Sequence, residues 1–159
     1  VIDIFTIDFP QNITQVHFIK LRLFDTKGKE VANTFYWRSN DKYEGRKTLT
    51  GPTSSGFEDL SKLKQVQLKT RYQTYQEGDR HFIKAEIKNP SSTVAFFTQL
   101  QLLGQDKKPV RPSFYTDNFF SLLPGESKTV IIETAASDMP SEPTFVVKGW
   151  NIKPSSFKL

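Results

Sequence analysis

The sequence predicts an all-β protein made of antiparallel strands, and three observations lead to this prediction. Apolar and polar residues alternate with a period of two along much of the chain, as a strand with one buried face requires. Turn-forming residues such as Gly, Pro, Asn and Asp separate these stretches at short intervals. No segment of about ten or more residues has apolar positions at helical spacing. Short strands joined by turns are therefore expected throughout.

The clearest strands lie between residues 64 and 152. Their predicted positions are 66–75, 83–87, 94–103, 128–134 and 144–150, with an aromatic-rich segment over 114–123. Turns or Pro-containing loops separate them at 76–79, 89–92, 104–112, 123–126 and 135–143. Roughly six or seven short strands with this spacing are typical of an immunoglobulin-like antiparallel β-sandwich.

The N-terminal region has strand-like sequence of its own. Three runs, Ile2–Phe9, Val16–Phe24 and Glu30–Trp37, alternate in the same way. A segment rich in Gly, Ser, Thr and charged residues follows, and then a single helical turn around Leu60. We therefore expect an appendage of extra strands over 1–38, a linker over 39–63 and the β-sandwich over 64–159.

Length and composition exclude several kinds of function. The chain has 159 residues and no Cys, so it has no disulfide framework, thiolate metal site or thiol nucleophile. A catalytic (β/α)₈ barrel needs about 250 residues and cannot fit. A net charge of +5 is a mild basic excess spread along the chain, so no nucleic acid binding is expected. The longest apolar runs fall far short of the ~20 residues of a membrane span.

Residues that carry chemistry elsewhere form no convincing site here. The two histidines, His17 and His81, each lie in a strand pattern without identifiable partners for a metal site or a catalytic triad. The carboxylate pairs Glu58–Asp59 and Asp117 with Glu126 are available for acid and base catalysis, but surface or turn positions explain them better. Phosphate-binding glycine loops are absent. We predict no catalytic residue, no metal site and no cofactor.

Aromatic residues occur in clusters, and each ring has two interpretations. Exposed rings stack on sugars or anchor interfaces, whereas buried rings fill the core. Phe96 alternates with core positions and is predicted to be buried. The better surface candidates have a polar group on the ring: Tyr36, Trp37, Tyr115 and Trp150.

Two motifs carry a resemblance to a known family. They are Asn33–Trp37, which reads Asn-Thr-Phe-Tyr-Trp, and the stretch from Pro109 to Ser127, which includes Asp117-Asn118-Phe119-Phe120 and Leu123-Pro124-Gly125-Glu126. With them the chain resembles the C-terminal region of glycoside hydrolase family 2. The most similar branch contains β-mannosidases, endo-β-mannosidases and exo-β-glucosaminidases.

The resemblance implies a fragment of a five-domain retaining glycosidase whose two catalytic Glu residues lie in a barrel outside this chain. Residues 1–38 would be the terminal strands of a preceding immunoglobulin-like domain. Residues 64–159 would be a non-catalytic C-terminal accessory domain whose partners are the remaining domains of the parent enzyme. The family favours a periplasmic or secreted location.

The resemblance also allows a contact between this domain and the substrate, and the same residues have a purely structural interpretation. If the domain borders the substrate cleft, Tyr115, Asp117 and Asn118 are the expected sugar contacts, because they combine an aromatic face with hydrogen-bonding groups. Otherwise, Asp117 and Asn118 form an Asx-type turn that positions the following strand. Other possible functions are an independent carbohydrate-binding module that takes oligosaccharides, and an adhesion module; the strands of residues 1–38 can also mediate self-association.

Overall fold

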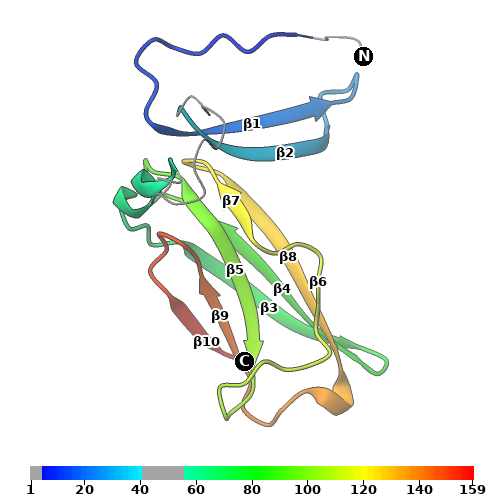
Figure 1. Cartoon of the computed structure of the whole chain (residues 1–159). Helices are drawn as coiled ribbons and strands as arrows, with labels where there is room; N and C mark the ends of the chain where they lie inside the picture. The colour runs from blue at the N-terminus through cyan, green and yellow to red at the C-terminus, as the bar shows by residue number, and fades with distance from the viewer. Residues whose placement is uncertain (1–4, 41–55) are drawn as a thin grey trace, which may run out of the picture. The chain divides into compact units, whose positions relative to one another are not determined.

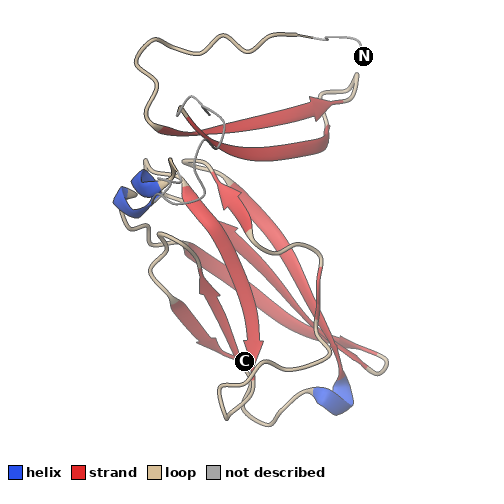
Figure 2. Cartoon of the chain, in the orientation of Figure 1, coloured by secondary structure: helices blue, strands red, loops and turns tan. Residues whose placement is uncertain are grey.

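The computed structural model describes residues 5–40 and 56–159, and it confirms the predicted all-β class (Figures 1 and 2). Strands pair antiparallel in every sheet of the described residues. The helical segments described are two short 3₁₀ helices, η1 (Glu58–Lys62) and η2 (Ala136–Asp138). Contacts divide the chain into two compact units, Val1–Lys62 and Leu63–Leu159.

The second unit is a sandwich of two four-stranded sheets. One sheet has the order β3-β4-β8-β6 and the other β10-β9-β5-β7. The strands are β3 (Lys69–Glu77), β4 (Arg80–Lys88), β5 (Ala95–Leu103), β6 (Phe114–Tyr115), β7 (Phe120–Leu122), β8 (Ser127–Ala135), β9 (Thr144–Lys148) and β10 (Ser155–Lys158). The predicted antiparallel β-sandwich is thus confirmed.

The core of the sandwich lies between the two sheets, because each strand turns alternate side chains inward. On β4, Ile83, Ala85 and Ile87 are buried while the residues between them are exposed. Phe145 on β9 is fully buried and packs its ring against Phe157, at 5.3 Å between ring centroids. Burial of such side chains supplies the main stabilisation, about 1.5–3 kcal/mol for each large one.

Two buried asparagines hold the loops at the end of the sandwich where β5 begins. The Asn89 amide donates to the carbonyl oxygens of Thr93 and Leu122, at 2.8 and 2.9 Å. The Asn151 carbonyl oxygen accepts from the Phe96 backbone N–H at 2.8 Å, and its amide donates to the carbonyl oxygen of Val94. These amides satisfy backbone groups that strand pairing leaves unpaired.

A β-bulge interrupts β5 close to its start. Ala95 pairs with Leu122 and Thr98 with Phe120, so β5 has one more residue than β7 between these pairs. The extra residue allows Ala95 and Phe96 to be buried in succession. Phe97 then has a φ of 58° and turns outward.

The first unit contains a two-stranded hairpin of β1 (Val16–Phe24) and β2 (Glu30–Ser39). The turn between them is closed by the Asp25 carboxylate, which accepts from the backbone N–H groups of Lys27 and Lys29 at 2.9 Å each. Its Gly28 has a φ of 78°, a conformation that glycine adopts without strain. Two of the three strands predicted in the N-terminal region are thus confirmed, and they pair as a hairpin.

Three details of the strand prediction are wrong. Residues 5–9 are not a strand, because no neighbouring segment in the described part of the chain pairs with them; residues 1–4 of that predicted strand lie outside the described residues. The strand predicted from residue 66 begins at Lys69, since Val66 makes only an isolated bridge to Ile152. Strand β10 was not expected, because its four residues include a single apolar side chain, Phe157, and so show no apolar alternation.

Candidate functional site at the Tyr115–Phe119 loop

Tyr115 forms part of the sandwich rather than standing free on the surface. Its side chain is half-buried and packs against the core, and its hydroxyl accepts a hydrogen bond from the Leu102 backbone N–H at 2.9 Å. Burial raises the pKa of Tyr115 above its usual value of 10, although the bond from Leu102 and a bond with Ser113 partly oppose the shift. The phenol therefore links β6 to β5.

The Asn118 side chain makes the hydrogen bonds to β5 that the backbone of a neighbouring strand would otherwise make. The amide carbonyl oxygen accepts from the Leu100 backbone N–H at 2.8 Å, and the amide nitrogen donates to the Leu100 carbonyl oxygen at 3.0 Å. The same oxygen accepts from the Phe119 backbone N–H at 3.1 Å. Asn118 thus pairs with β5 through both polar atoms of its amide, in the way a neighbouring strand would.

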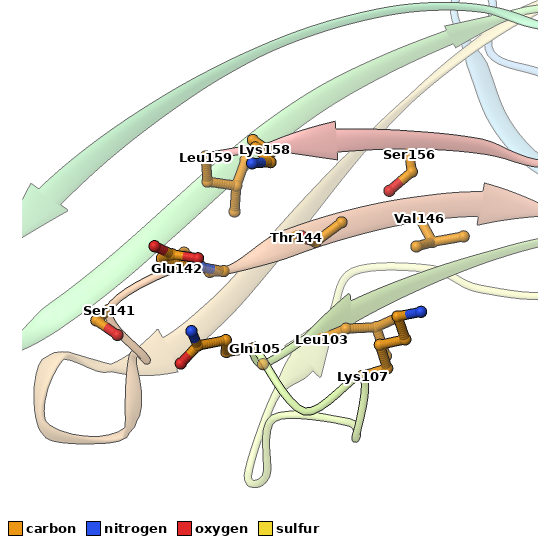
Figure 3. Close-up of a pocket in the computed structure, with 12 residues that line it drawn as sticks. Leu103, Gln105, Lys107, Ser141, Glu142, Thr144, Val146, Ser156, Lys158 and Leu159 are labelled. Carbon is orange, nitrogen blue, oxygen red and sulfur yellow. The ribbon is translucent and has the colours of Figure 1, made fainter.

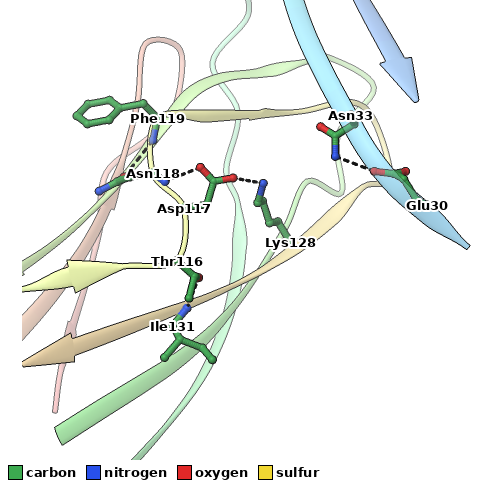
Figure 4. Close-up of polar contacts among 8 residues, drawn as sticks. All are labelled: Glu30, Asn33, Thr116, Asp117, Asn118, Phe119, Lys128 and Ile131. Carbon is green, nitrogen blue, oxygen red and sulfur yellow. Dashed lines mark hydrogen bonds and ion pairs between the residues drawn. The ribbon is translucent and has the colours of Figure 1, made fainter. Parts of the chain in front are cut away.

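Asp117 lies at the turn of the loop, where Figure 4 shows it between Asn118 and Lys128. One carboxylate oxygen accepts from the Asn118 backbone N–H at 2.7 Å, and the other forms an ion pair with the Lys128 ammonium group. The ammonium nitrogen also lies 5.1 Å from the centre of the Phe120 ring, in cation–π contact. The carboxylate and its partner are both partly exposed.

The structure brings together two of the three predicted contact residues. Tyr115 and Asn118 line a shallow hollow of about 160 Å³ together with Arg111, whereas Asp117 does not line it. This volume is below the roughly 300–1,000 Å³ of typical ligand pockets. The contact of these residues with a sugar stays a prediction. The hydrogen bonds described above show that Tyr115 and Asn118 also bond to the backbone of β5.

Three exposed aromatic residues lie outside the predicted site, and we call them the aromatic end cluster: Phe97, Phe119 and Trp150, whose backbone N–H donates to the Phe96 carbonyl oxygen next to Phe97. They are 38%, 51% and 60% exposed, and the Phe97 and Phe119 ring centroids lie 5.7 Å apart. Figure 4 shows the Phe119 ring pointing away from its loop. The prediction that Trp150 is a surface residue is confirmed.

A signal for this cluster was present in the sequence. Two Phe-Phe pairs, at 96–97 and 119–120, interrupt the alternating pattern. In each pair one ring is buried and the other is exposed: Phe96 and Phe120 point into the core, and Phe97 and Phe119 point outward. Doubled aromatics in a period-two strand therefore indicate a bulge or turn that exposes one ring.

A second hollow, of about 550 Å³, lies on the outer face of β5, β9 and β10 (Figure 3). Its apolar lining includes Leu103 and Val146, and its polar lining includes Lys107, Glu142 and Ser156. Its volume is in the range of ligand pockets. The sequence analysis did not identify it, because the lining residues come from three separate segments.

Three other candidates, Glu126, Asp59 and His17, have structural partners. The Glu126 carboxylate accepts from the Leu123 backbone N–H at 2.8 Å and closes the turn between β7 and β8, while Asp59 pairs with Lys62 at 2.6 Å. The His17 ring packs edge-on against Phe9, at 5.3 Å between centroids. Within residues 5–40 and 56–159, no group of His, Asp and Glu side chains has the geometry to hold a metal ion. In the same residues, no helix is long and apolar enough to cross a membrane.

Comparison with known protein families gives a match over most of the sandwich. Residues 48–152 match the model of the exo-β-D-glucosaminidase Ig-fold domain. Its description agrees with the two antiparallel sheets and with the predicted immunoglobulin-like architecture.

Two curated relatives bear the name exo-β-D-glucosaminidase. The protein from Streptomyces avermitilis is 30% identical in an alignment 149 residues long; the match covers 87% of this chain and 16% of the relative. The protein from Amycolatopsis orientalis is 27% identical in an alignment 157 residues long; the match covers 92% of this chain and 15% of the relative. This chain therefore spans less than a fifth of the length of these relatives.

Solved structures agree on the fold. The exo-chitosanase CsxA of Amycolatopsis orientalis superposes with a TM-score of 0.78 at 23% identity, over 94% of this chain and 19% of the other. In a complex of a CsxA variant with PNP-β-D-glucosamine, the TM-score is 0.82 at 22% identity, over 98% of this chain and 19% of the other.

Proposed function

Because the chain belongs to the exo-β-D-glucosaminidase Ig-fold domain family, we propose that it is a non-catalytic accessory domain of a longer glycoside hydrolase of the exo-β-D-glucosaminidase type. The observation that carries the proposal is the family match over residues 48–152. The resemblance to the immunoglobulin-like region of glycoside hydrolase family 2 is confirmed, and the relatives support the glucosaminidase branch, not the β-mannosidase one.

Catalysis in such a parent belongs to another domain. A retaining glycosidase needs two carboxylates on either side of the scissile bond, with separations of about 5–5.5 Å. Asp117 and Glu126 of the sandwich are engaged within it, Asp117 with Lys128 and Glu126 with the Leu123 backbone. The role of this domain is then to support the catalytic domain of the parent by packing against it.

The N-terminal hairpin fits a second part of the proposal, in which residues 1–38 are the last strands of a preceding immunoglobulin-like domain. In the described residues, β1 and β2 pair only with each other. Leu23 and Phe24 are 62% and 51% exposed on this hairpin. A preceding domain would supply the missing strands, whereas pairing between two copies of the chain is the alternative and predicts a concentration-dependent dimer.

Two assays test the accessory role. The isolated 159-residue chain is expected to release no nitrophenol from PNP-β-D-glucosamine, while the full-length parent does. Deletion of residues 63–159 from the parent is expected to lower its midpoint of thermal unfolding and its activity together, because the catalytic domain loses a packing partner. Hydrolysis by the isolated chain, or a parent whose activity and unfolding midpoint survive the deletion, would contradict the proposal.

We also propose that Tyr115, Asp117 and Asn118 border the substrate cleft of the parent. Asp117 is the most informative of them, because its carboxylate is partly exposed. In the parent, Asp117→Ala is expected to raise KM several-fold with kcat little changed, which is the signature of a lost substrate contact. Lys128→Met is the matched control, since it breaks the same ion pair but keeps the carboxylate. Equal effects of the two changes would mean that only the ion pair matters.

An independent carbohydrate-binding module is the second candidate function. The hollow of about 550 Å³ on β5, β9 and β10 favours it, because apolar and polar side chains converge there. Isothermal titration of the isolated chain with manno- and chito-oligosaccharides tests it. Submillimolar binding would support this function if Glu142→Gln or Lys107→Met weakened it. An absence of binding would contradict this function and leave the accessory role.

A further inference from the structure

The backbone around the aromatic end cluster is shaped to hold its rings outside the core. Phe97 occupies the bulge of β5 with a φ of 58°, and Phe119 has a φ of 57°. A left-handed backbone is uncommon for a residue other than glycine and is unfavourable for a bulky one. Such strain persists where surrounding contacts impose it, and it concentrates at functional surfaces. In the described residues, three side-chain-bearing residues have a positive φ: Phe97 and Phe119 belong to this cluster and their rings touch, whereas Lys107 lies in the turn that follows β5.

Neighbouring polar groups impose this conformation. The Ser121 hydroxyl accepts from the Phe97 backbone N–H at 3.2 Å, and the Asn118 amide oxygen accepts from that of Phe119. Beside them, the Trp150 backbone N–H donates to the Phe96 carbonyl oxygen at 3.0 Å. This close approach requires Gly149, because a Cβ atom there would lie 2.9 Å from the Phe97 carbonyl oxygen. The cluster is therefore preorganised.

The geometry fits an apolar protein surface better than a sugar. Sugar rings stack on a flat aromatic face beside free hydrogen-bonding groups. The Phe97 and Phe119 rings are instead tilted by 54° to each other. A pair of exposed rings tilted in this way resembles the centre of a protein interface, where aromatic anchors fill apolar recesses.

We propose that the aromatic end cluster is the docking surface for an apolar patch on another domain of the same parent chain. The inference rests on the proposed accessory function. This chain spans 16% and 15% of the lengths of the two relatives, so a parent of similar length has most of its polypeptide outside this chain. Docking covers Phe97, Phe119 and Trp150, and it makes the backbone strain at Phe97 and Phe119 part of a stable interface.

Hydrogen exchange tests the docking in two proteins, the isolated 159-residue chain and the full-length parent. The backbone amides of residues 96–98 and 118–121 are expected to exchange about tenfold more slowly in the parent, because the covered segments open less often. Phe119→Ser in the parent is expected to remove most of this protection. Phe114→Ser is the matched control, since Phe114 is 56% exposed on β6 and outside the cluster; it is expected to leave the exchange unchanged.

The possible outcomes separate the inference from the function on which it rests. Equal exchange of these amides in the two proteins overturns the docking surface, whereas the deletion of residues 63–159 still tests the accessory role. Equal loss of protection with Phe119→Ser and Phe114→Ser also overturns it, because the effect then has no specific site. If glucosamine oligomers slowed the exchange of residues 118–121 in the isolated chain, the cluster would bind a sugar, and the docking of another domain would be overturned.

Discussion

The hairpin β1–β2 and the sandwich contain strands of similar length and similar alternation, yet they differ in what covers their apolar faces. In the sandwich, β4 turns Ile83, Ala85 and Ile87 onto a second sheet, and these side chains are almost completely buried. In the hairpin, Leu23 and Phe24 remain more than half exposed. Alternation therefore specifies which face is apolar, while burial requires a second layer.

The largest expected effect comes from emptying the core of the sandwich. Phe145→Ala is expected to lower the free energy of unfolding by about 4 kcal/mol, because it leaves a cavity where the ring packs on Tyr72 and Phe157. Phe24→Ala on the hairpin is the matched control and is expected to cost less than about 0.5 kcal/mol. Urea denaturation followed by circular dichroism measures both. Similar losses would show that the hairpin is as well packed as the sandwich.

Removing a hydrogen-bonding side chain should also destabilise the sandwich much more than the hairpin. Asn151→Ala is expected to cost about 3 kcal/mol, since it leaves the Phe96 N–H and the Val94 carbonyl oxygen unpaired in a buried site. On the hairpin, Asn33 donates to the Glu30 carboxylate at 2.7 Å in an exposed position. Asn33→Ala is expected to change stability by less than about 0.5 kcal/mol. A small effect at Asn151 would mean that water replaces its amide.

The sequence predicts the parts of this fold that depend on local pattern. Strands β4, β5 and β8 and the turn at Pro124 and Gly125 follow from alternation and from turn chemistry. Strand β10 does not, because residues 155–158 become a strand only by pairing with β9. The interruption of β5 is a similar case, since the bulge depends on its pairing with β7.

The candidate site shows the same limit at the level of side chains. The sequence marks Tyr115, Asp117 and Asn118 as polar groups beside aromatics, which is compatible with a sugar contact or with a turn. Only the fold shows that Asn118 bonds to the backbone of Leu100, which is 18 residues away. Hydrogen-bond partners distant in sequence leave no periodic signal, so the use of such groups is decided by tertiary structure.

A smaller effect is expected from the half-buried phenol of Tyr115. Tyr115→Phe removes the acceptor of the Leu102 N–H and is expected to cost about 1 kcal/mol at neutral pH. Tyr36→Phe on the hairpin is the control, since Tyr36 is exposed, and little change is expected there. Thermal unfolding of the two variants checks the difference.

The same tyrosine gives the sandwich a pH dependence with a definite sign. Burial raises the pKa of Tyr115, so the folded chain keeps its phenol proton at pH values where the unfolded chain loses it. The stabilising contribution is full below pH of about 10 and is lost as the pH rises from there through the folded pKa. The wild-type chain should therefore lose stability in this range more steeply than Tyr115→Phe. Parallel curves would contradict a raised pKa.

The smallest effect is expected from removing residues 1–55. All members of the main core cluster lie between Val66 and Ile152, so the sandwich carries its own core. We therefore expect the midpoint of thermal unfolding of residues 56–159 to differ from that of the whole chain by less than about 4 °C, which corresponds to less than about 1 kcal/mol.

The hairpin should not survive the same separation, because an isolated two-stranded hairpin is marginally stable at best in water. A peptide of residues 14–40 is expected to give the narrow amide proton dispersion of an unfolded chain. Residues 56–159 should at the same time give the wide dispersion of a folded one. If the peptide folds alone, its strands do not need a further sheet, and the assignment of residues 1–38 to a preceding domain loses its physical basis.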